Sequence, residues 1–402
     1  MTSEWHEVPL RELVGYISKG IAPSYAEEAS ESTIRVLNQK CNRNFRISYG
    51  DSRLHDTRKK KVPPERYVKP DDILINSTGA GTAGRIAQIE DVPSATTIDG
   101  HMILIRSNGK VTQKFLGYAL KAHQWEVLQL DEGSTGQTEL NRDRLLDEIM
   151  INYPVSLDEQ NAIVGTLESI DRKLIVNEQL NDNLEQQAQA IYHERFETVS
   201  PNDMPSEWRI VTLGEVATIS NKSFNPLKEP EILLEHYSIP AFDEARFPVF
   251  ELSTSIKSNK FIIDASCFMI SKLNPTTKRV WKPYCLTGNA VCSTEFIVYK
   301  AKDKTITDFL YSVIDSNSFS DFMCSHVTGS TGSRQRTTPS DTLSYELILP
   351  SGDELAEFQS LVSPMYAQIR INAIENDRLK RLRDSLLPKL MSGEIDVSTI
   401  QL

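Results

Sequence analysis

The sequence contains the same pattern twice, and this duplication constrains the fold more than any other feature. W-H-E-V-P-L-R-E-L at 5–13 and W-R-I-V-T-L-G-E-V at 208–216 share Trp, Val, Leu and Glu at an offset of 203. G-S-T-G at 133–136 recurs at 329–332, and a strand-like segment ends at Pro154 and again at Pro350, both at an offset of 196. A repeat of this kind indicates two structurally similar halves. We therefore predict a tandem duplication of one folding unit.

Each half passes from short, turn-bounded apolar runs to a long helical pattern. Apolar runs bounded by Gly, Pro, Asn and Ser predict strands. They lie at 72–75, 85–89 and 101–105 in the first half and at 261–264, 267–270 and 295–299 in the second. Wider apolar spacing predicts short helices at 112–128 and 305–323. We predict an α+β protein with mixed domains at 1–153 and 201–350, and with long helices at 154–200 and 351–402.

The long helical segments carry matching apolar seams that are interrupted by asparagine. Ile163, Leu167, Ile170 and Leu174 follow helical spacing, and the seam then reaches Asn177 and Asn181. At an offset of 195, the second half places Asn372 and Asn376 at the same seam positions. This pattern predicts two antiparallel helices in a pseudo-two-fold coiled coil, where the four asparagines meet and fix the register. The alternative is that they lie on an exposed helix edge.

The ends of these helices can also be predicted. A helix over 157–196 would be about 60 Å long at 1.5 Å per residue. Pro364 predicts that the second helix starts or kinks there, since proline fits a first turn but not a helix interior. Ser392 and Gly393 predict its end after Met391.

The stretch D-I-L-I-N-S-T-G-A-G-T-A-G at 72–84 matches the G-x-G-x-x-G spacing of a dinucleotide-binding turn through Gly79, Gly81 and Gly84. Such a turn must open a helix, whose N-terminus holds the phosphate. The residues that follow, R-I-A-Q-I-E-D-V-P-S, alternate like a strand and meet Pro93. Aligning Ile75 with Ile270 places the glycine-free L-N-P-T-T opposite the glycines. We therefore predict a variable turn between two strands, which lies close to a DNA groove.

Composition excludes several other classes of protein. The 402 residues are enough for two to four folding units, and no stretch approaches the ~20 apolar residues of a membrane helix. The N-terminus lacks the basic and apolar regions of a signal peptide, so we expect a cytoplasmic protein without a membrane partner. Five cysteines without C-x-x-C, and histidines without H-E-x-x-H, argue against a disulfide framework and a metal site.

The net charge of −11 averages over segments that differ strongly in local charge. Residues 35–69 hold eleven Lys or Arg against three acids, whereas 158–197 hold nine acids against three bases. The second half has basic segments at 272–282 and 330–338. Lys and Arg neutralise phosphates, and Arg, Asn and Gln can read base edges. Two units that carry such residues and are joined by paired helices would suit a DNA with two separated sites. A solvated surface remains the alternative for a single charge run such as R-K-K-K at 58–61.

Taken together, these motifs resemble the specificity (S) subunit of Type I restriction-modification systems over nearly the whole chain. The resemblance rests on the paired W-x-x-V-x-L-x-E openings, D-I-L-I followed by G-R, the G-S-T-G loops, P-V-S-L-D-E-Q-N-A-I-V-G-T-L-E-S-I-D at 154–171, and L-L-P-K-L-M-S-G-E-I at 386–395. One departure is Glu354-Leu355 opposite Glu159-Gln160, so any contact that Gln160 makes is not duplicated.

The resemblance implies a non-catalytic subunit with two target recognition domains, each of which reads one half of a split double-stranded DNA site. The conserved helices would set the gap and bind two methyltransferase (M) subunits, and restriction (R) subunits would join in the full enzyme. No cofactor is expected on this chain. S-adenosylmethionine and ATP with Mg²⁺ would bind the partners, and the complex would be an adenine-N6 DNA methyltransferase and ATP-dependent endonuclease.

We assign candidate DNA contacts by residue type. For phosphates we predict Lys40, Arg43, Arg46, Lys59, Lys60, Lys272, Lys278 and Lys282. For bases in the first half we predict Asn42, Asn76, Ser77, Thr78, Arg85, Ser134, Thr135 and Gln137. For bases in the second half we predict Asn274, Thr276, Arg279, Ser330, Arg334, Gln335 and Arg336.

Two other functions were weighed. A stand-alone adenine methyltransferase needs an N-P-P-[YF]-like motif, and F-N-P-L at 224–227 and L-N-P-T at 273–276 lack the second proline and the aromatic residue. A metal-dependent nuclease needs paired acids followed by E-x-K on a strand, which the sequence lacks. A scaffold that joins two protein-binding modules without DNA is the other alternative.

Overall fold

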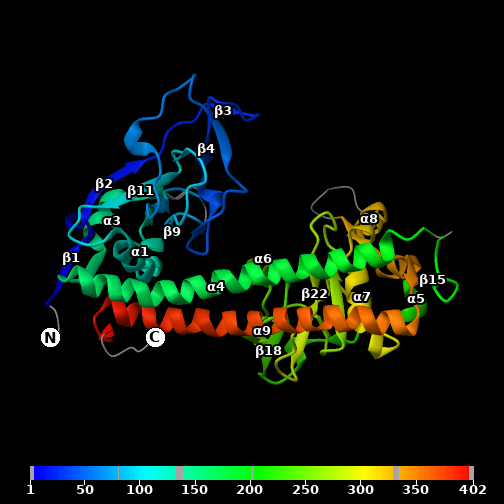
Figure 1. The fold of residues 1–402 in the computed structure, drawn as a ribbon. Coiled ribbons are helices and arrows are strands. Elements are labelled where there is room, and N and C mark those ends of the chain that lie inside the picture. Colours follow the sequence, from blue (N-terminus) through cyan, green and yellow to red (C-terminus); the bar gives the residue numbers. More distant parts are fainter. Residues whose placement is uncertain (1–3, 80, 133–138, 201–202, 329–334, 398–402) are drawn as a thin grey trace. The chain divides into compact units, whose positions relative to one another are not determined.

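The computed structural model describes residues 4–79, 81–132, 139–200, 203–328 and 335–397, and it divides into two compact units. Unit 1 comprises Met1–Lys173 and Lys380–Leu402, and unit 2 comprises Leu174–Leu379. Two long helices, α4 (Leu157–Tyr192) and α9 (Gly352–Met391), each contribute a segment to both units (Figure 1). Each unit is therefore a mixed α/β module with a segment of both helices.

The core of unit 1 is built on a four-stranded antiparallel sheet in the order β2-β11-β8-β9. Its strands are β2 (Val14–Lys19), β8 (Ile73–Asn76), β9 (Ile86–Gln88) and β11 (Met102–Ser107). Side chains alternate between the two faces of a strand, and here both faces are covered. Ile73 and Ile75 belong to the core that includes helix α1, whereas Leu74 packs into a second cluster on the other face. This two-sided burial explains why D-I-L-I reads as a continuous apolar run.

A second sheet and several short elements complete unit 1. The second sheet, in the order β10-β4-β7-β3, contains β3 (Tyr25–Ala26), β4 (Thr33–Leu37), β7 (Arg53–Asp56) and β10 (Thr96–Ile98). The two-stranded pairs are β1 (Trp5–Pro9) with β14 (Met150–Pro154), β5 (Asn42–Arg43) with β6 (Arg46–Ile47), and β12 (Asp131–Glu132) with β13 (Glu139–Leu140). The helices are α1 (Gln113–Ala122), α2 (Gln124–Leu128) and α3 (Arg142–Glu148).

The antiparallel sheet of unit 1 recurs in unit 2 with the same strand order, which confirms the predicted duplication. Its antiparallel sheet has the order β16-β24-β21-β22, with β16 (Ala217–Ile219), β21 (Cys267–Ser271), β22 (Val280–Trp281) and β24 (Phe296–Ala301). Its second sheet, β17-β20-β23-β18-β19, contains β17 (Ser223–Phe224), β18 (Leu233–Tyr237), β19 (Val249–Leu252), β20 (Lys260–Ile262) and β23 (Ala290–Ser293). One parallel strand pair occurs in the second sheet of each unit, β10 with β4 and β23 with β18.

The remaining elements of unit 2 also have counterparts in unit 1. β15 (Arg209–Thr212) pairs with β27 (Glu346–Leu349), as β1 pairs with β14, and β25 (Val327–Thr328) pairs with β26 (Arg336–Thr337). The helices are α5 (Leu213–Val216), α6 (Ile239–Ala245), α7 (Thr307–Ile314) and α8 (Asn317–Ser325). The predicted helices at 112–128 and 305–323 are each two helices in the structure, α1 with α2 and α7 with α8. The breaks fall at His123 and at Asp315-Ser316, where the Ser316 hydroxyl accepts from the Phe319 N–H and caps α8.

The first long helix has its predicted extent, and the second differs at one point. α4 begins at Leu157 and continues past Tyr192 as the π-helical turn His193–Glu197. α9 begins at Gly352 and runs through Pro364, so of the two predicted effects of the proline a helix start is wrong, while a kink stays a prediction. Pro364 lies on the exposed side, as does Ser360 one turn earlier, so water can satisfy the Ser360 carbonyl that loses its intrahelical donor. The helix ends at Met391 as predicted, and Gly393 follows with a positive φ of 76°.

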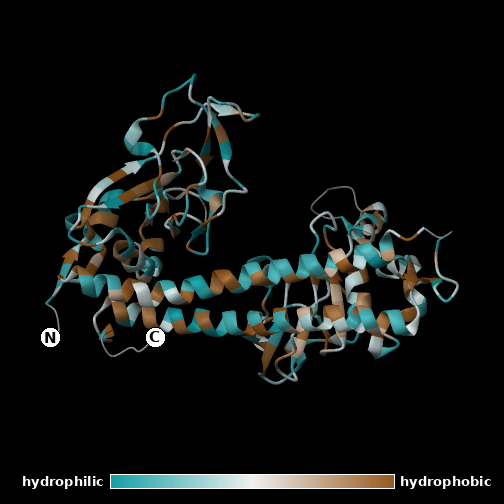
Figure 2. Cartoon of the chain, viewed as in Figure 1, coloured by the Kyte–Doolittle hydropathy of each residue, from teal (hydrophilic) through white to brown (hydrophobic). Residues whose placement is uncertain are grey.

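Hydrophilic and hydrophobic residues alternate along both long helices, as expected for helices with one buried stripe (Figure 2). Within the described part of the chain, no helix combines the length and the hydropathy that crossing a lipid bilayer requires.

Candidate nucleic-acid interface

The glycine-rich stretch of unit 1 is a turn between β8 and β9. Ile73 pairs with Gln88 and Ile75 with Ile86 in an antiparallel hairpin, so a strand and not a helix follows the glycines. Gly79, Gly81 and Gly84 have φ values of 116°, 68° and 83°, which side chains other than glycine adopt at a cost. The predicted turn is confirmed. Because no helix N-terminus adjoins it, it lacks the phosphate-binding feature of a dinucleotide fold.

A buried polar layer supports this turn. The Asn42 side chain donates to Asn76 Oδ1 (3.2 Å) and to the Arg85 carbonyl (2.8 Å), and Asn76 Nδ2 donates to the Gln39 carbonyl (3.1 Å). Asn42 is 1% exposed, and Asn76 and Ser77 are 0% exposed. Our prediction that these three side chains read bases is therefore corrected, because they are inaccessible. Asn42 and Asn76 hold the 39–42 segment against the turn, and the Ser77 hydroxyl donates to the Gly100 carbonyl (3.4 Å).

A surface group of polar side chains lies at the start of the turn. The Thr78 hydroxyl is 2.7 Å from His101 Nδ1 and donates to Gln39 Oε1 at 3.4 Å. Arg85 is half-buried and donates to the Gly81 carbonyl at 3.2 Å. Sequence patterns did not predict Gln39 or His101, since the contacts join residues 39 and 23 positions apart. Thr78 and Arg85 are predicted base contacts that the structure places around this turn.

Basic residues flank the same region on the segment that the asparagines hold. Lys40 and Arg43 are exposed, and Arg46 is half-buried. Arg43 and Arg46 pair across a tight hairpin whose two central residues, Asn44 and Phe45, have φ values of 51° and 62°. The predicted phosphate contacts at 40–46 and the predicted base contacts at 78–85 are thus brought together, although they are far apart in the sequence.

The R-K-K-K run at 58–61 lies elsewhere in unit 1. Lys59 is exposed, Lys60 Nζ donates to the Ala22 carbonyl (3.0 Å), and Arg58 pairs with Asp56. The hydrogen bonds from Arg58 lower the pKa of Asp56. None of the hydrogen bonds of these described side chains reaches the turn at 77–85. Lys59 and Lys60 therefore belong to a separate basic segment.

Unit 2 has the corresponding turn between β21 and β22, without glycines. The Asn274 N–H donates to the Gln335 carbonyl (2.9 Å), the Thr337 N–H donates to the Lys272 carbonyl (3.1 Å), and Leu273 forms a bridge with Arg336. The predicted contact segments at 272–279 and 335–336 therefore form one surface. In unit 1, Thr78 forms the equivalent bridge with Glu139.

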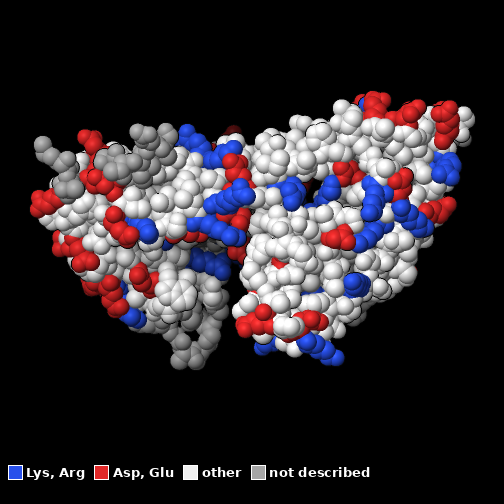
Figure 3. Space-filling view, turned by 90° about the horizontal axis from the view of Figure 1, so that it is seen from below, with Lys and Arg blue, Asp and Glu red and all other residues white. Residues whose placement is uncertain are grey.

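Most of the predicted cations of this second surface are paired with acids. Arg279 makes two hydrogen bonds to Asp243 (2.6 and 2.9 Å), and Arg336 makes two to Glu295 (2.9 and 3.0 Å). The hydrogen bonds to Glu295 raise the pKa of Arg336. Asn274 and Thr276 hydrogen-bond each other at 3.1 Å within the turn. Basic and acidic side chains are interspersed on the face of the molecule drawn in Figure 3.

Two predicted phosphate contacts are directed away from the turn. Lys278 pairs with Asp315 at 2.9 Å, and Lys282 pairs with Asp308 of α7. Lys282 also lies 5.5 Å from the centre of the Tyr366 ring on α9, so its ammonium group faces the helices. We therefore withdraw Lys282 as a phosphate contact. Lys272 makes no ion pair with any described residue and stays a candidate.

Five predicted base contacts, Ser134, Thr135, Gln137, Ser330 and Arg334, lie outside the described residues. The strands that flank them, β12 with β13 and β25 with β26, are the hairpins whose second strands bridge to Thr78 and Leu273. Both turns therefore adjoin the G-S-T-G hairpin of their own unit. Among the described residues, no group of three His, Cys, Asp or Glu side chains is placed to hold a metal ion.

The four seam asparagines contact one another inside unit 2. Asn177 Nδ2 donates to Asn376 Oδ1 (2.8 Å), and Asn372 Nδ2 donates to Asn181 Oδ1 (2.8 Å). Since Asn177 corresponds to Asn372 and Asn181 to Asn376 in the repeat, a two-fold exchange of the helices converts one contact into the other. The helices are therefore antiparallel here. Asn177 and Asn372 are buried, so the exposed-edge alternative is wrong, while a role in fixing register stays a prediction.

Gln160 has an internal role in unit 1. Its Oε1 accepts from the Thr112 N–H (2.8 Å) at the start of α1, and its Nε2 donates to the Pro154 carbonyl (2.9 Å). Leu355 takes this place in unit 2 and packs in the apolar core. The Gln160 contact is thus replaced by hydrophobic packing.

Comparisons with known proteins agree with the resemblance. Residues 2–186 match the family model of the Type I restriction modification DNA specificity domain. The chain is 25% identical over 335 residues to the Type I restriction enzyme MjaIX specificity subunit of Methanocaldococcus jannaschii, covering 76% of this chain and 74% of the relative. It is 33% identical over 93 residues to the HindI specificity subunit of Haemophilus influenzae, covering 23% and 20%.

Among solved structures, the chain is similar to the crystal structure of a Type-I restriction-modification system S subunit from M. genitalium. The TM-score is 0.57 at 15% identity, with 97% of this chain and 96% of the other covered. This likeness supports the fold.

Proposed function

We propose how this chain, which belongs to the family of Type I restriction-modification specificity subunits, selects and measures its DNA site. It is a DNA specificity subunit and not the catalytic component. In our proposal, each unit reads one half of a split double-stranded site, through the turn that follows β8 in unit 1 and β21 in unit 2.

The observation that carries this proposal is that the same surface occurs in both units with different side chains. Each surface joins a hairpin turn, at 77–85 or 272–279, to the hairpin that bears G-S-T-G. Unit 1 presents Thr78, Arg85 and flanking cations, whereas unit 2 presents Asn274, Thr276 and Arg336. Different side chains on one scaffold would select different base sequences, so the two half-sites should be unlike.

Arg336 is the strongest candidate for a base contact in unit 2. Its side chain is 43% exposed, and its guanidinium is held by two hydrogen bonds to Glu295. The same planar group can bond to O6 and N7 of guanine. Arg279 is 13% exposed and held by Asp243, so we assign it to shaping the turn.

The paired helices would set the distance between the half-sites and bind two methyltransferase subunits, with restriction subunits in the full complex. S-adenosylmethionine and ATP with Mg²⁺ would then bind to those partners. The complex would methylate adenine N6 and cleave DNA in an ATP-dependent reaction. The missing N-P-P-[YF]-like motif supports a division of labour in which this chain supplies selection.

Sequencing of methylated adenines tests the proposal. The chain would be co-produced with its methyltransferase subunit, and we expect a split motif with two unlike halves. Arg336→Ala should relax one base position in one half and leave the other half unchanged, at a cost of about 1–3 kcal/mol for that base. A continuous motif, or changes in both halves, would contradict the assignment. Methyl transfer by this chain alone would refute the subunit function.

Lys40→Gln and Arg43→Gln are expected to weaken binding to all DNA sequences by a similar factor. Each exposed cation would neutralise a phosphate, so its loss should reduce the slope of log affinity against log salt by about one. Fluorescence anisotropy of the assembled complex at several salt concentrations measures both effects. Lys59→Gln is the comparison from the separate basic segment. If Lys40→Gln or Arg43→Gln changed the preferred DNA sequence, that residue would instead be assigned to base reading.

A further inference from the structure

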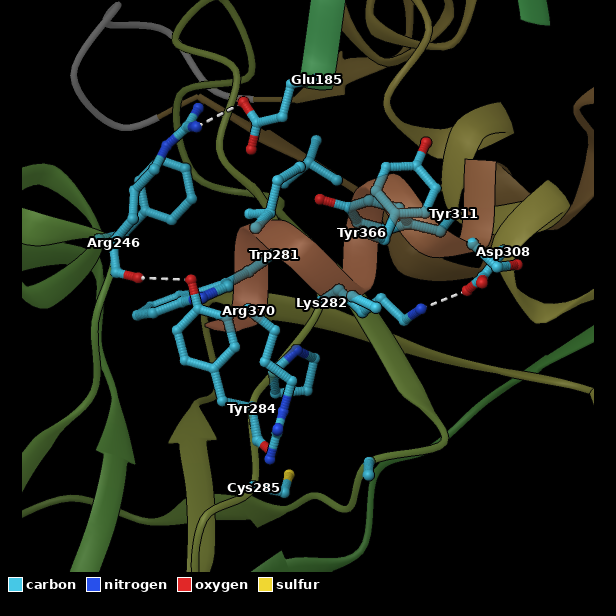
Figure 4. A pocket seen from close by; sticks show the side chains of 17 residues that line it. Glu185, Arg246, Trp281, Lys282, Tyr284, Cys285, Asp308, Tyr311, Tyr366 and Arg370 are labelled. Atoms are coloured by element: carbon cyan, nitrogen blue, oxygen red, sulfur yellow. Dashed lines mark hydrogen bonds and ion pairs between the residues drawn. The ribbon is translucent and has the colours of Figure 1, made fainter. Parts of the chain in front are cut away.

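Unit 2 contains a cavity of about 370 Å³ between its recognition module and helix α9 (Figure 4). One wall is formed by β22 and the segment after it, from Val280 to Cys285. The opposite wall is the stretch of α9 from Ser363 to Arg370, and α4 and α7 contribute Glu185, Asp308 and Tyr311. This volume is within the range of small-molecule sites, which lies at roughly 300–1,000 Å³.

Five aromatic residues are among those that line the cavity: Phe242, Trp281, Tyr284, Tyr311 and Tyr366. Trp281 packs edge-on against Phe242, with ring centres 5.4 Å apart, and Tyr311 packs edge-on against Tyr366 at 4.9 Å. The Tyr366 hydroxyl is fixed by Ser312 at 2.7 Å, and the Tyr284 hydroxyl by the Arg246 carbonyl at 3.1 Å. Burial raises the pKa of Tyr284 to about 12, so this phenol stays neutral at physiological pH. Ring packing and hydrogen bonds thus hold the aromatic walls in place, and these walls are suited to a flat ring.

The charged groups around the cavity leave one cation uncompensated. Arg246 pairs with Glu185 at 2.6 Å, and Lys282 pairs with Asp308. Arg370 is exposed at the rim, and its guanidinium donates to the Tyr284 carbonyl at 3.2 and 3.4 Å without an ion pair to a described acid. A guanidinium has five N–H donors, so Arg370 retains donors for an incoming carboxylate.

We propose that this cavity binds a planar aromatic molecule that carries one carboxylate. The ring would lie among Trp281, Tyr284 and Tyr366, and the carboxylate would pair with Arg370. An uncharged aromatic would leave Arg370 uncompensated, and a cation would face two arginines and Lys282. The carboxylate therefore gives the best charge match.

The site goes beyond the proposed function, because no DNA contact is required for binding. It would nevertheless affect DNA reading, since Val280 and Trp281 directly follow the 272–279 turn while Arg370 is on α9. A ligand that contacts both would fasten the turn of unit 2 to this helix.

Isothermal titration calorimetry of the full chain with 2-naphthoate tests the site, with naphthalene-2-carboxamide as the uncharged match. We expect the acid to bind about tenfold more tightly than the amide, because one charge-assisted contact is added. Arg370→Gln should weaken the acid about tenfold and leave the amide unchanged. Ala367→Trp, which places an indole in the cavity wall, should abolish binding of both.

Arg378→Gln is the control, since Arg378 is an exposed arginine on the same helix and does not line the cavity. It should bind both compounds as the unchanged chain does. Three outcomes would each overturn the proposal. They are equal affinity for the acid and the amide, no binding of either compound at millimolar concentration, and normal binding of the acid by the Arg370→Gln chain. None of these outcomes depends on DNA recognition, so failure here is separate from failure of the proposed function.

Discussion

Replacing Asp171 with asparagine is expected to destabilise unit 1 by about 3 kcal/mol, because it leaves the largely buried Lys121 without its counter-ion and Arg383 with the exposed Asp384 as its remaining ion-pair partner. Asp171 Oδ2 accepts from the Tyr118 hydroxyl (2.9 Å) and from Lys121 Nζ (3.2 Å), and Oδ1 accepts from Arg383 (3.0 Å). The side chains of Lys121, Asp171 and Arg383 are 10%, 17% and 13% exposed. This cluster joins α1, α4 and α9, so we expect hydrogen exchange of α1 amides to accelerate in the variant.

Asp182→Asn is the control, since Asp182 is an exposed acid on the same helix, in the segment of α4 that belongs to unit 2. It should leave the urea or thermal transition of unit 1 almost unchanged. If both variants had the same small effect, the Asp171 cluster would be a surface network with little energetic weight.

The same cluster predicts a pH dependence. Burial acts to raise the pKa of Asp171, but Lys121 and Arg383 outweigh it, and the pKa is lowered. A carboxyl group with a lowered pKa in the folded state contributes stability above its unfolded pKa of about 3.9. This contribution is lost as the pH falls below about 4 and through the lower folded value. Acid unfolding of Asp171→Asn should therefore show a shallower loss of stability in this window than the unchanged chain.

Unit 2 uses uncharged groups at the corresponding place. Aligning α1 with α7 places Ser312 opposite Tyr118, and the helix repeat places Tyr366 opposite Asp171. The Ser312 and Tyr366 hydroxyls are 2.7 Å apart, so a hydrogen bond replaces the charge cluster. The two modules are therefore attached to the helices by different chemistry, and only the attachment in unit 1 should weaken through this position as the pH falls below about 4.

The features that could be predicted from the sequence are those that follow from local patterns of residues or from the repeat. Alternation and turn residues predicted β8, β21 and the turns that follow them, and the 195-residue offset predicted which asparagines meet. The patterns did not predict burial of Asn42, Asn76 and Ser77, because amides on a surface and amides in a buried layer look alike in sequence. The removal of Lys282 from the candidate site could not be predicted either, since its partner Asp308 is 26 positions away.

In the asparagine layer of the helix pair, a single substitution is expected to lower the stability of unit 2, whereas a double substitution is expected to maintain or raise it. Asn177 Nδ2 donates both to Asn376 Oδ1 (2.8 Å) and to Glu375 Oε2 (2.7 Å), so Asn376→Leu alone leaves one N–H of this buried amide without its acceptor and should cost about 1–3 kcal/mol of stability in unit 2. Asn177→Leu combined with Asn376→Leu removes both amides, takes one donor from the half-buried Glu375, and adds apolar surface of similar shape. The double variant should match or exceed the stability of the unchanged chain, by up to about 4 kcal/mol.

The loss of polar pairs should also reduce the specificity with which the two helices pair. A polar pair at one seam position penalises every register in which an amide faces an aliphatic side chain, and a leucine pair removes the penalty. The Asn181–Asn372 pair still penalises other registers in the double variant, so we expect the variant with leucine at all four positions to methylate sites with more than one spacing, while each half-site sequence stays the same. Urea unfolding and methylated-adenine sequencing measure the two effects separately. A fourfold leucine variant that is more stable than the unchanged chain and still keeps a single spacing would show that the asparagines do not set the register. A double variant less stable than Asn376→Leu would contradict the stability prediction.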